Sequence, residues 1–223
     1  MADPTYLALS QWGGTANGWP SMELPAVELW AHHSVTNEEI GVHPTDDAIA
    51  DFRELDALGL SRGHGGISYS DAIHPNGIIG EGQGTRRGAH TAGDGCNHSP
   101  WGHNPCSFGV CFIGDFHPRF IGDVWFPGDT LTDAAINSFR WLRDKLTSEG
   151  VLVPGIYPTG GHRDASGNST ACPGDNIEGR LDELRAPYSA ELPAEEPFMK
   201  LLRAVDTGKV HLWTEVAVTY ISD

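Results

Sequence analysis

The chain has 223 residues and a mass of 24.0 kDa, which suits one domain with a small appendage. Its 30 acidic residues against 14 basic ones give a net charge of −16, which disfavours nucleic acid and anionic membrane surfaces as partners. No stretch approaches the roughly 18–20 apolar residues of a membrane span, so we expect no membrane insertion, and a monomer is the default expectation.

Three segments have the residue spacing of helices. Residues 45–60 begin with Thr45 as the expected N-cap, and residues 132–150 begin with Thr132. Both segments then carry apolar side chains every three to four positions and meet a glycine at their end. A shorter helix is expected over 175–185.

Before the first helix, and between it and the second, the apolar period changes to two, which indicates strands. We expect them over 27–32, 67–73, 77–82 and 108–116. The second and third strands are joined by a His-Pro-Asn-Gly turn over 74–77, a strong hairpin signal. Strands that alternate with helices over most of the chain predict an α/β fold, with helices against the faces of a sheet.

The final part of the sequence has a different composition. Residues 186–197 are rich in Pro, Ala and Glu and read as a linker, whereas the residues after it contain a hairpin signal at Asp206-Thr207-Gly208. We therefore expect a main domain over 1–185, an acidic linker over 186–197, and a short C-terminal β segment over 198–223.

Three side chains far apart in the sequence have the chemistry of a catalytic zinc site. His32 ends the first strand, His162 follows two glycines, and Cys172 precedes Pro173-Gly174 at the start of the third helix. Two imidazoles and a thiolate bind Zn²⁺ while leaving one position open for water. We expect the helix start to favour the thiolate form of Cys172. The eleven histidines also allow the alternative of two surface histidines and a buried thiol.

Five ordered motifs narrow the interpretation. They resemble those of the zinc N-acetylmuramoyl-L-alanine amidases, a family that phage endolysins share with peptidoglycan recognition proteins. The motifs read LWAHHSVT, ISYSDAIHPNGIIGEGQG, GAHT, NPCSFGVCFIGDF and GHRDASGNSTACPGD. The resemblance covers about residues 10–185. It implies a mixed central β-sheet flanked by α-helices, and hydrolysis of the amide between the lactyl group of N-acetylmuramic acid and L-alanine in bacterial peptidoglycan.

The same resemblance implies which residues bind the metal. The first histidine of the His-His pair is the ligand, so His32 is preferred over His33, and His162 and Cys172 complete the set for Zn²⁺. The zinc would bind the carbonyl oxygen of the scissile amide and a water molecule. The cytosolic recycling branch of the family is disfavoured, because it has an aspartate where this chain has Cys172.

Two residues are implied as catalytic. Tyr69 matches a phenol that hydrogen-bonds the attacking water or the oxyanion, and Thr170 matches the threonine of the recognition-protein branch. No glutamate falls in a matching place, so the role of general base is assigned to zinc-bound hydroxide with help from Tyr69. The alternative for Tyr69 is a half-buried strand residue without a chemical role.

The substrate-binding residues are expected in two segments. The resemblance places the GAHT segment, with His90 and Thr91, along the groove for the glycan and its peptide, and Asn104 and Trp101 are further candidate contacts. Asn104 has the alternative role of holding its loop. Trp101 would either stack on a sugar or cap the same loop.

The segment 96–106 allows three interpretations. Cys96 and Cys106 could form a disulfide, or they could remain free thiols, as synthesis in the cytoplasm favours. They could also join His98 and His103 in a second, closed zinc site.

The expected biological setting is that of a phage endolysin. The N-terminus has no pattern of a secretion signal, and lysine supplies only three of the 14 basic residues. Such an enzyme would be made in the host cytoplasm and would act on the cell wall after release, with the C-terminal segment as a candidate wall or partner contact. The alternative is a peptidoglycan-binding recognition domain without catalysis, although such relatives typically lack the third metal ligand, here Cys172.

Overall fold

The structure is a computed structural model. It describes residues 3–35, 41–95, 102–155 and 158–189, together with the backbone of 202–203 and 210–211. The chain divides into a larger unit, Asp3–Ser189, and a second unit that comprises Met1–Ala2 and Ala190–Asp223. Within the second unit, β9 (Leu202–Arg203) and β10 (Val210–His211) pair in antiparallel orientation.

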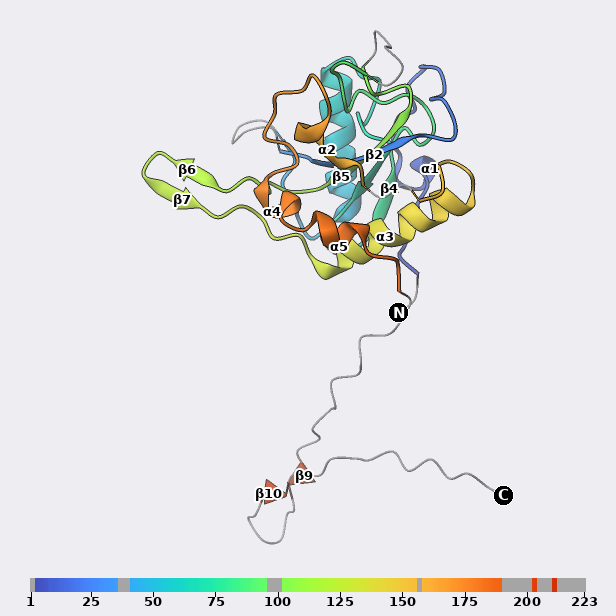
Figure 1. The fold of residues 1–223 in the computed structure, drawn as a ribbon. Helices are drawn as coiled ribbons and strands as arrows, with labels where there is room; N and C mark the ends of the chain where they lie inside the picture. The colour runs from blue at the N-terminus through green and yellow to red at the C-terminus, as the bar shows by residue number, and fades with distance from the viewer. Residues whose placement is uncertain are drawn as a thin grey trace, which may run out of the picture. The chain divides into compact units, whose positions relative to one another are not determined.

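Six strands form a mixed sheet at the centre of the larger unit (Figure 1). They are β1 (Tyr6–Leu7), β2 (Glu28–His33), β3 (Asp71–Ile73), β4 (Ile79–Glu81), β5 (Ser107–Phe112) and β8 (Gly160–Gly161). The order across the sheet is β1-β4-β3-β5-β2-β8. β2 lies parallel to both β5 and β8, whereas β3 and β4 form an antiparallel hairpin. The predicted α/β fold with a mixed central sheet is confirmed.

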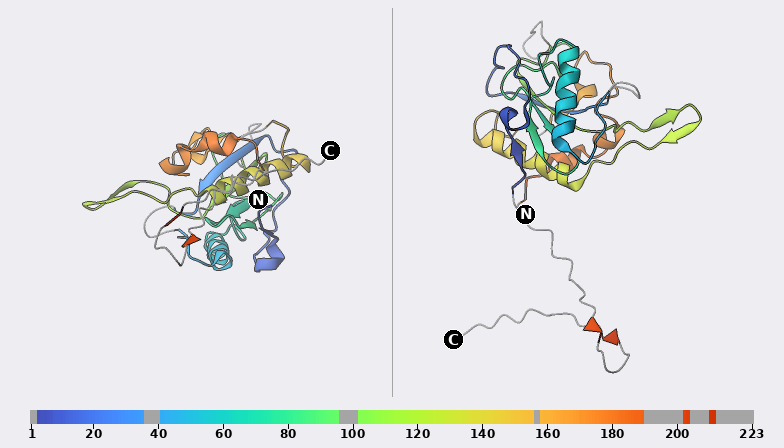
Figure 2. Two further views of the ribbon diagram at one scale, coloured as in Figure 1. Left: turned by 90° about the horizontal axis from the view of Figure 1, so that it is seen from below. Right: turned by 180° about the vertical axis from the view of Figure 1, so that it is seen from behind.

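Helices cover both faces of this sheet. They are α1 (Leu9–Trp12), α2 (Ala48–Ser61), α3 (Asp133–Ser148), α4 (Asp175–Glu178) and α5 (Leu181–Arg185), with a 3₁₀ turn, η2, at His162–Asp164. Figure 2 shows α2 and α3 on opposite faces. Successive side chains of β5 point to opposite faces of the sheet, so this one strand contributes to both hydrophobic cores. Phe108, Val110 and Phe112 belong to the core that contains α3, and Cys111 belongs to the core that contains α2.

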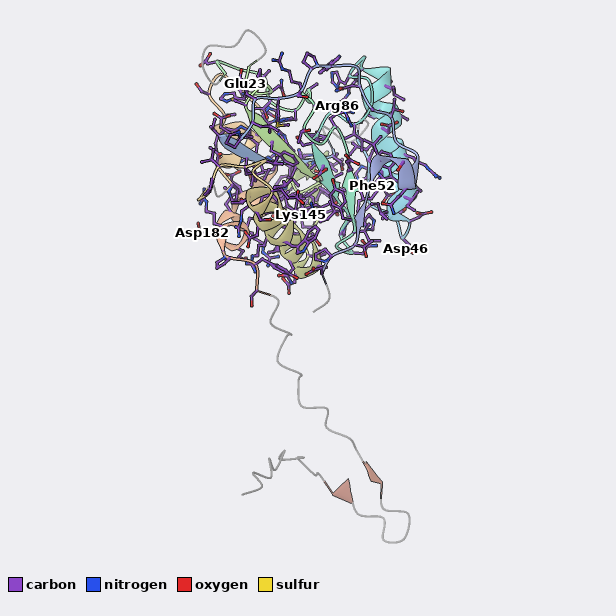
Figure 3. All side chains as sticks on the ribbon, turned by 90° about the vertical axis from the view of Figure 1, so that its right-hand side faces the viewer. Glu23, Asp46, Phe52, Arg86, Lys145 and Asp182 are labelled. Carbon is purple, nitrogen blue, oxygen red and sulfur yellow. The ribbon has the colours of Figure 1, made fainter. Side chains whose placement is uncertain are left out.

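A buried aromatic side chain anchors each of the two long helices. Phe52 of α2 packs against Trp12 with ring centroids 6.0 Å apart, and Phe139 of α3 stacks on Phe112 at 5.7 Å. Full burial of such a side chain contributes about 1.5–3 kcal/mol to stability. Phe52 is fully buried, whereas Asp46, which precedes α2, is exposed at the periphery of the unit (Figure 3).

The start of α2 differs from the prediction. Its N-cap is Asp47, whose carboxylate accepts the backbone N–H groups of Ile49 and Ala50. Thr45 instead donates its N–H and its hydroxyl to the buried carboxylate of Asp51. Thr45 lies two residues too early to reach the free N–H groups of the first turn, so the shorter path from Asp47 decides the cap.

Two other boundaries test the same reasoning. Thr132 caps α3 as predicted, because its hydroxyl accepts the N–H of Ala135. The single helix predicted over 175–185 is divided instead into α4 and α5, with Gly179 at the break. Within the described part of the chain, no helix has both the length and the apolar character needed to cross a bilayer.

A second hairpin follows β5 and was not predicted. β6 (Arg119–Ile121) and β7 (Val124–Phe126) pair in antiparallel orientation on either side of Gly122. The hairpin extends away from the rest of the larger unit (Figure 2). The pair Gly122-Asp123 between two apolar stretches was the available hairpin signal in the sequence, and the prediction did not use it.

Candidate metal and catalytic site

The end of β2 lies beside a loop from much later in the chain. β8 pairs with β2 so that Gly161 stands opposite Ala31. The next residue along the chain is a histidine in both cases, His32 within β2 and His162 directly after β8, and the two ring centroids are only 4.7 Å apart. The two glycines thus aim His162 through strand pairing as well as through their freedom to turn.

Cys172 completes this cluster. Its Sγ lies 3.6 Å from His32 Nδ1 and accepts the backbone N–H of His33 at 3.4 Å. One potential ligand atom from each of His32, His162 and Cys172 lies within 4.8 Å of the other two. The structure therefore brings the three predicted ligands together, and His33 contributes its backbone rather than its ring.

The geometry of the cluster fits zinc. Typical bond lengths are about 2.0–2.1 Å for Zn–N and about 2.3 Å for Zn–S, which place nitrogen and sulfur about 3.6 Å apart in a tetrahedron. The distance between His32 Nδ1 and Cys172 Sγ is 3.6 Å. Two imidazoles and one sulfur would leave one tetrahedral position for water or substrate, the arrangement of a catalytic zinc site.

Two glycines allow the loop of Cys172 to approach β2. A Cβ on Gly161 would lie 2.3 Å from Cδ of Pro173, and one on Gly174 would lie 2.4 Å from the carbonyl group of Phe116. Gly174 also has a φ of +91°, which L residues rarely adopt. A side chain at either position would displace the segment that carries Cys172.

A series of buried polar side chains holds Nε2 of His32, the ring nitrogen that does not face Cys172. Thr91 Oγ1 lies 3.3 Å from His32 Nε2 and 2.8 Å from His90 Nδ1. Asn104 Oδ1 accepts the backbone N–H groups of both His90 and Thr91, each at 2.9 Å. Since Thr91 and His32 are fully buried, water does not compete for these contacts.

His162 has an equivalent partner. Its Nε2 lies 3.0 Å from Oδ1 of Asn168, an amide oxygen that can only accept, so Nε2 carries the proton. Asn168 is itself fixed, because its amide nitrogen donates to the carbonyl of Ala92 at 2.8 Å. In both histidines the Nε2 atom is engaged and Nδ1 is left for a metal, the arrangement that partners behind the ligands usually impose.

Burial governs the charge state of the candidate ligands. It lowers the pKa of His32 well below its ordinary value and also lowers the pKa of His162, so both are neutral and able to bind a metal. Burial raises the pKa of the Cys172 thiol to about 12. The expected preference for thiolate at the helix start is therefore wrong, because α4 has only four residues and burial outweighs its dipole. A bound cation would reverse this preference.

The ring of Tyr69 lies next to the ring of His32. Its ring centroid lies 5.1 Å from that of His32, and its hydroxyl donates to the carbonyl of His33 at 3.3 Å. Burial raises the pKa of the Tyr69 hydroxyl, which therefore stays protonated and acts as a hydrogen-bond donor.

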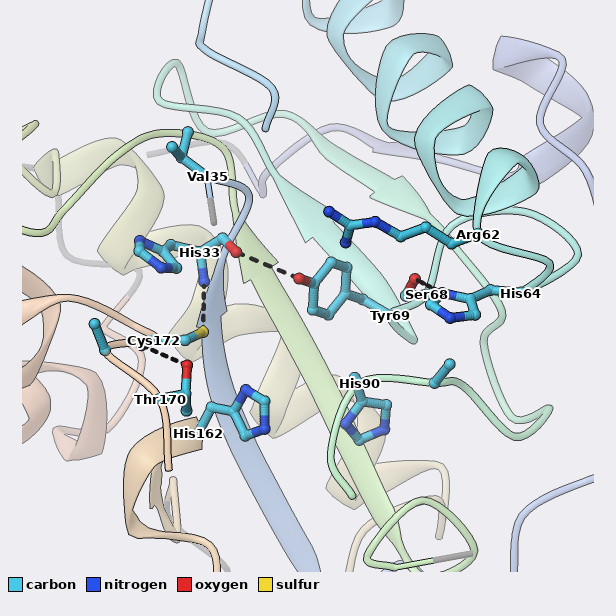
Figure 4. A pocket seen from close by; sticks show the side chains of 12 residues that line it. His33, Val35, Arg62, His64, Ser68, Tyr69, His90, His162, Thr170 and Cys172 are labelled. Atoms are coloured by element: carbon cyan, nitrogen blue, oxygen red, sulfur yellow. Dashed lines mark hydrogen bonds between the residues drawn. The ribbon is translucent and has the colours of Figure 1, made fainter. Parts of the chain in front are cut away.

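A pocket of about 230 Å³ lies beside the candidate ligands (Figure 4). Tyr69, His90, His162, Thr170 and Cys172 all contribute to its wall. The hydroxyl of Thr170 accepts the N–H of Cys172 at 3.1 Å, so it also fixes the ligand loop.

Sequence reasoning missed two further residues of the wall, Arg62 and His64. They follow α2 directly, and His64 Nδ1 lies 2.6 Å from the hydroxyl of Ser68. The run Arg-Gly-His-Gly-Gly after a helix was the available signal, because glycines at a helix end mark a tight return of the chain.

Of the predicted substrate-binding residues, some line the pocket and others do not. His90 lines the pocket, and its Nε2 is buried without a hydrogen-bond partner among the described residues. Thr91 does not reach the pocket, because its side chain is fully buried behind His32. Asn104 holds the GAHT segment through the two N–H groups that it accepts. Trp101 lies outside the described residues.

The second proposed zinc site is not supported. His103 Nδ1 lies 2.7 Å from a carboxylate oxygen of Glu28, and His103 Nε2 lies 3.2 Å from the carbonyl of Ser166. Cys106 belongs to a disulfide and is therefore not available as a metal ligand. Its predicted partner Cys96, together with His98, lies outside the described residues, so that pairing stays a prediction.

Carboxylates and an arginine lie behind the ligand loop. Arg163 donates to Asp175 at 2.7 Å, and its Nε lies 3.8 Å from Glu178 Oε2. Asp164 accepts the N–H of Gly161 at 2.9 Å. Burial first, and then the neighbouring Asp164, raise the pKa of Glu178 to about 7. The helix that follows the ligand loop therefore carries a carboxyl group that titrates near neutrality.

A comparison with protein families gives a direct match. The model described as N-acetylmuramoyl-L-alanine amidase matches residues 27–175, which contain all three candidate ligands and Tyr69. No curated protein matches the chain.

Several solved structures share the fold. Bumblebee PGRP-SA has 25% sequence identity and a TM-score of 0.63, covering 80% of this chain and 94% of that one. Drosophila peptidoglycan recognition protein SD has 22% identity and a TM-score of 0.63, covering 85% and 98%. Human PGRP-IβC, solved in complex with glycosamyl muramyl pentapeptide, has 21% identity and a TM-score of 0.63, covering 80% and 95%.

Proposed function

Because the chain belongs to the N-acetylmuramoyl-L-alanine amidase family, we propose that it uses Zn²⁺ to hydrolyse bacterial peptidoglycan, at the amide between the lactyl group of N-acetylmuramic acid and L-alanine. One observation carries the proposal. The potential ligand atoms of His32, His162 and Cys172 lie within 4.8 Å of one another, and His162 and Cys172 line a pocket that Tyr69 also lines, with His32 buried next to them. Binding of a glycan or a peptide alone needs no such set of metal donors.

The chemistry divides between the metal and the protein. Bound Zn²⁺ would polarise the amide carbonyl and lower the pKa of the attacking water. Tyr69 supplies a hydrogen-bond donor: its hydroxyl donates to the His33 carbonyl at 3.3 Å, and the same hydrogen would turn to the substrate carbonyl when substrate binds. A donor held in place before the reaction stabilises negative charge on the carbonyl oxygen at little cost in reorganisation. Thr170 keeps Cys172 in place through the N–H that its hydroxyl accepts.

The test is release of new N-termini from purified peptidoglycan. We expect L-alanine termini to appear with the wild-type protein, to vanish with a chelator, and to return when Zn²⁺ is restored. Cys172→Ala should remove both zinc and release. Release that persists in the metal-free protein would sink the zinc mechanism.

A recognition domain without catalysis is the second candidate. It is favoured by the likeness to solved recognition proteins, one of which was crystallised with a muramyl pentapeptide. In the same experiment this candidate predicts that the zinc-loaded protein pellets with peptidoglycan and frees no alanine.

The endolysin setting is also part of the proposal. Its support is compositional, because lysine supplies only three of the 14 basic residues, a usage typical of a GC-rich genome. An endolysin made in the host cytoplasm should lyse its producer only when the membrane is opened. Expression with and without a pore-forming protein tests this, and lysis without membrane opening would contradict it.

A further inference from the structure

The β6–β7 hairpin presents apolar side chains to solvent. Phe120 stands opposite Trp125 across the two strands, and their ring centroids are 5.0 Å apart in an edge-to-face arrangement. Phe120 is 67% exposed, Trp125 54% and Val124 70%. Soluble proteins rarely expose such a cluster unless it has a binding role.

The base of the hairpin is held firmly. The guanidinium of Arg119 donates to both oxygens of Asp115, at 2.9 and 2.7 Å, and lies over the ring of Phe126 at 5.3 Å. The side-chain amide of Asn176 donates to the carbonyls of Pro127 and Asp129, at 3.0 and 2.8 Å. The aromatic pair is therefore presented on a fixed support, which lowers the entropy lost on binding.

The same base adjoins the candidate metal site. β5 and β2 are parallel, with Phe112 opposite His33, so the chain enters the hairpin from the edge of the sheet where the ligands lie. Asn176, four residues after Cys172, donates its backbone N–H to the carbonyl of Phe116 at 3.1 Å. A polymer bound in the pocket would thus meet the root of the hairpin close by.

Size and charge limit what the hairpin can bind. The exposed parts of its three apolar side chains amount to roughly 400 Å², about half of the roughly 800 Å² that each partner contributes to a stable protein interface. The turn carries Asp123, and the chain has a net charge of −16, which opposes anionic lipid surfaces. A small aromatic surface of this kind suits a neutral ring.

We propose that Phe120 and Trp125 stack on sugar rings of the peptidoglycan glycan strand, outside the catalytic pocket. This inference rests on the proposed function for the identity of the polymer. The negative face of an aromatic ring attracts C–H groups with partial positive charge, and one face of a pyranose ring consists of such groups. A pocket of about 230 Å³ holds only the region around the scissile bond, so the rest of the strand must run over neighbouring surface.

The experiment compares binding with turnover. In the double variant Phe120→Ser/Trp125→Ser we expect the Kd for insoluble glycan strands, stripped of peptide and measured by pelleting, to rise roughly 10-fold. kcat/KM for a soluble muramyl tripeptide should stay within about twofold of wild type. Phe120→Tyr/Trp125→Tyr, which keeps both rings, should retain binding. Leu24→Ser removes an exposed apolar side chain elsewhere (49% exposed) and should have no effect.

Each other outcome has a defined meaning. Equal binding of the serine variant and wild type to stripped glycan would overturn the proposal. So would a loss confined to peptide-bearing wall, or to vesicles of phosphatidylglycerol, because the partner would then be peptide or lipid. A wild-type protein that binds glycan through the hairpin but frees no alanine would disprove the amidase activity and leave the hairpin site intact.

Discussion

Each nitrogen of His32 has its own neighbour. Nδ1 faces Cys172 Sγ at 3.6 Å, and Nε2 faces the hydroxyl of Thr91 at 3.3 Å. Thr91 is in turn fixed by Asn104, which accepts its backbone N–H. The ring can therefore offer Nδ1 to a metal without searching among orientations, and this is the usual purpose of partners behind a metal ligand.

Removal of the Thr91 hydroxyl tests this role. Thr91→Val preserves the shape of the side chain but leaves His32 Nε2 without its partner, so we expect the Kd for Zn²⁺ to rise roughly 10–100-fold. Competition with a chromophoric chelator measures it. Thr91→Ser keeps the hydroxyl and should bind zinc nearly as well as wild type. Equal affinities for the two variants would show that the hydroxyl does not position His32.

Tyr69 is a separate case, because it lines the pocket but is not one of the candidate metal ligands. Tyr69→Phe removes only the donor, so kcat for alanine release should fall roughly 10–1000-fold. Metal analysis should still find about one zinc per chain. Unchanged turnover would remove Tyr69 from the mechanism, whereas loss of zinc would make its role structural.

At the scale of elements, α4 carries a carboxyl group whose protonation makes the stability of the fold depend on pH. Glu178 on this helix has a pKa raised to about 7 in the folded protein, from an ordinary value of 4.5. The folded state thus holds this proton more tightly than the unfolded state does. Stability from this group is complete below about pH 4.5, falls as the pH rises, and is lost above about pH 7.

Glu178→Gln removes that titration. We expect the fall in Tm between pH 5 and pH 8 to be smaller in this variant than in wild type, as measured by thermal unfolding in matched buffers. Glu54→Gln on α2, at an exposed position, is the control and should follow wild type. If the Tm of Glu178→Gln fell between pH 5 and pH 8 as much as that of wild type, the pH dependence would belong to other groups.

Local signals in the sequence explain what could be predicted. Thr132 precedes a clear helical stripe and caps it, and His32 lies next to the last residue of β2, whose apolar run the sequence shows plainly. The contact of Thr91 with His32 joins residues 59 positions apart and depends on how two segments pack, so no local pattern encodes it. Arg62 was missed for the same reason, since only the return of the chain after α2 brings it to the pocket.

At the scale of the molecule, the candidate metal site joins β2, the strand next to one edge of the sheet, to the segment that follows the edge strand β8. β2 supplies one ligand, while β8 and the segment after it bring the other two. An ion that binds only the folded chain stabilises it by mass action, which amounts to about 4 kcal/mol at a free concentration 1,000 times the Kd.

Zinc should therefore raise the Tm of the whole domain in a concentration-dependent way. Differential scanning calorimetry of the metal-free protein, titrated with Zn²⁺, measures the effect. Cys172→Ala should abolish it, and Cys111→Ala, which removes a buried thiol of the opposite core, should retain it. A Tm independent of zinc in the wild-type protein would contradict the site.

The distance along the chain between His32 and Cys172, 140 positions, has a consequence for biosynthesis. A ribosome that has released only the first 160 residues has exposed one ligand of three. The nascent chain thus cannot assemble the three-ligand site until Cys172 has left the ribosome. Products of translation that is interrupted before Cys172 lack the complete site too, and so they should not bind the metal as the full chain does.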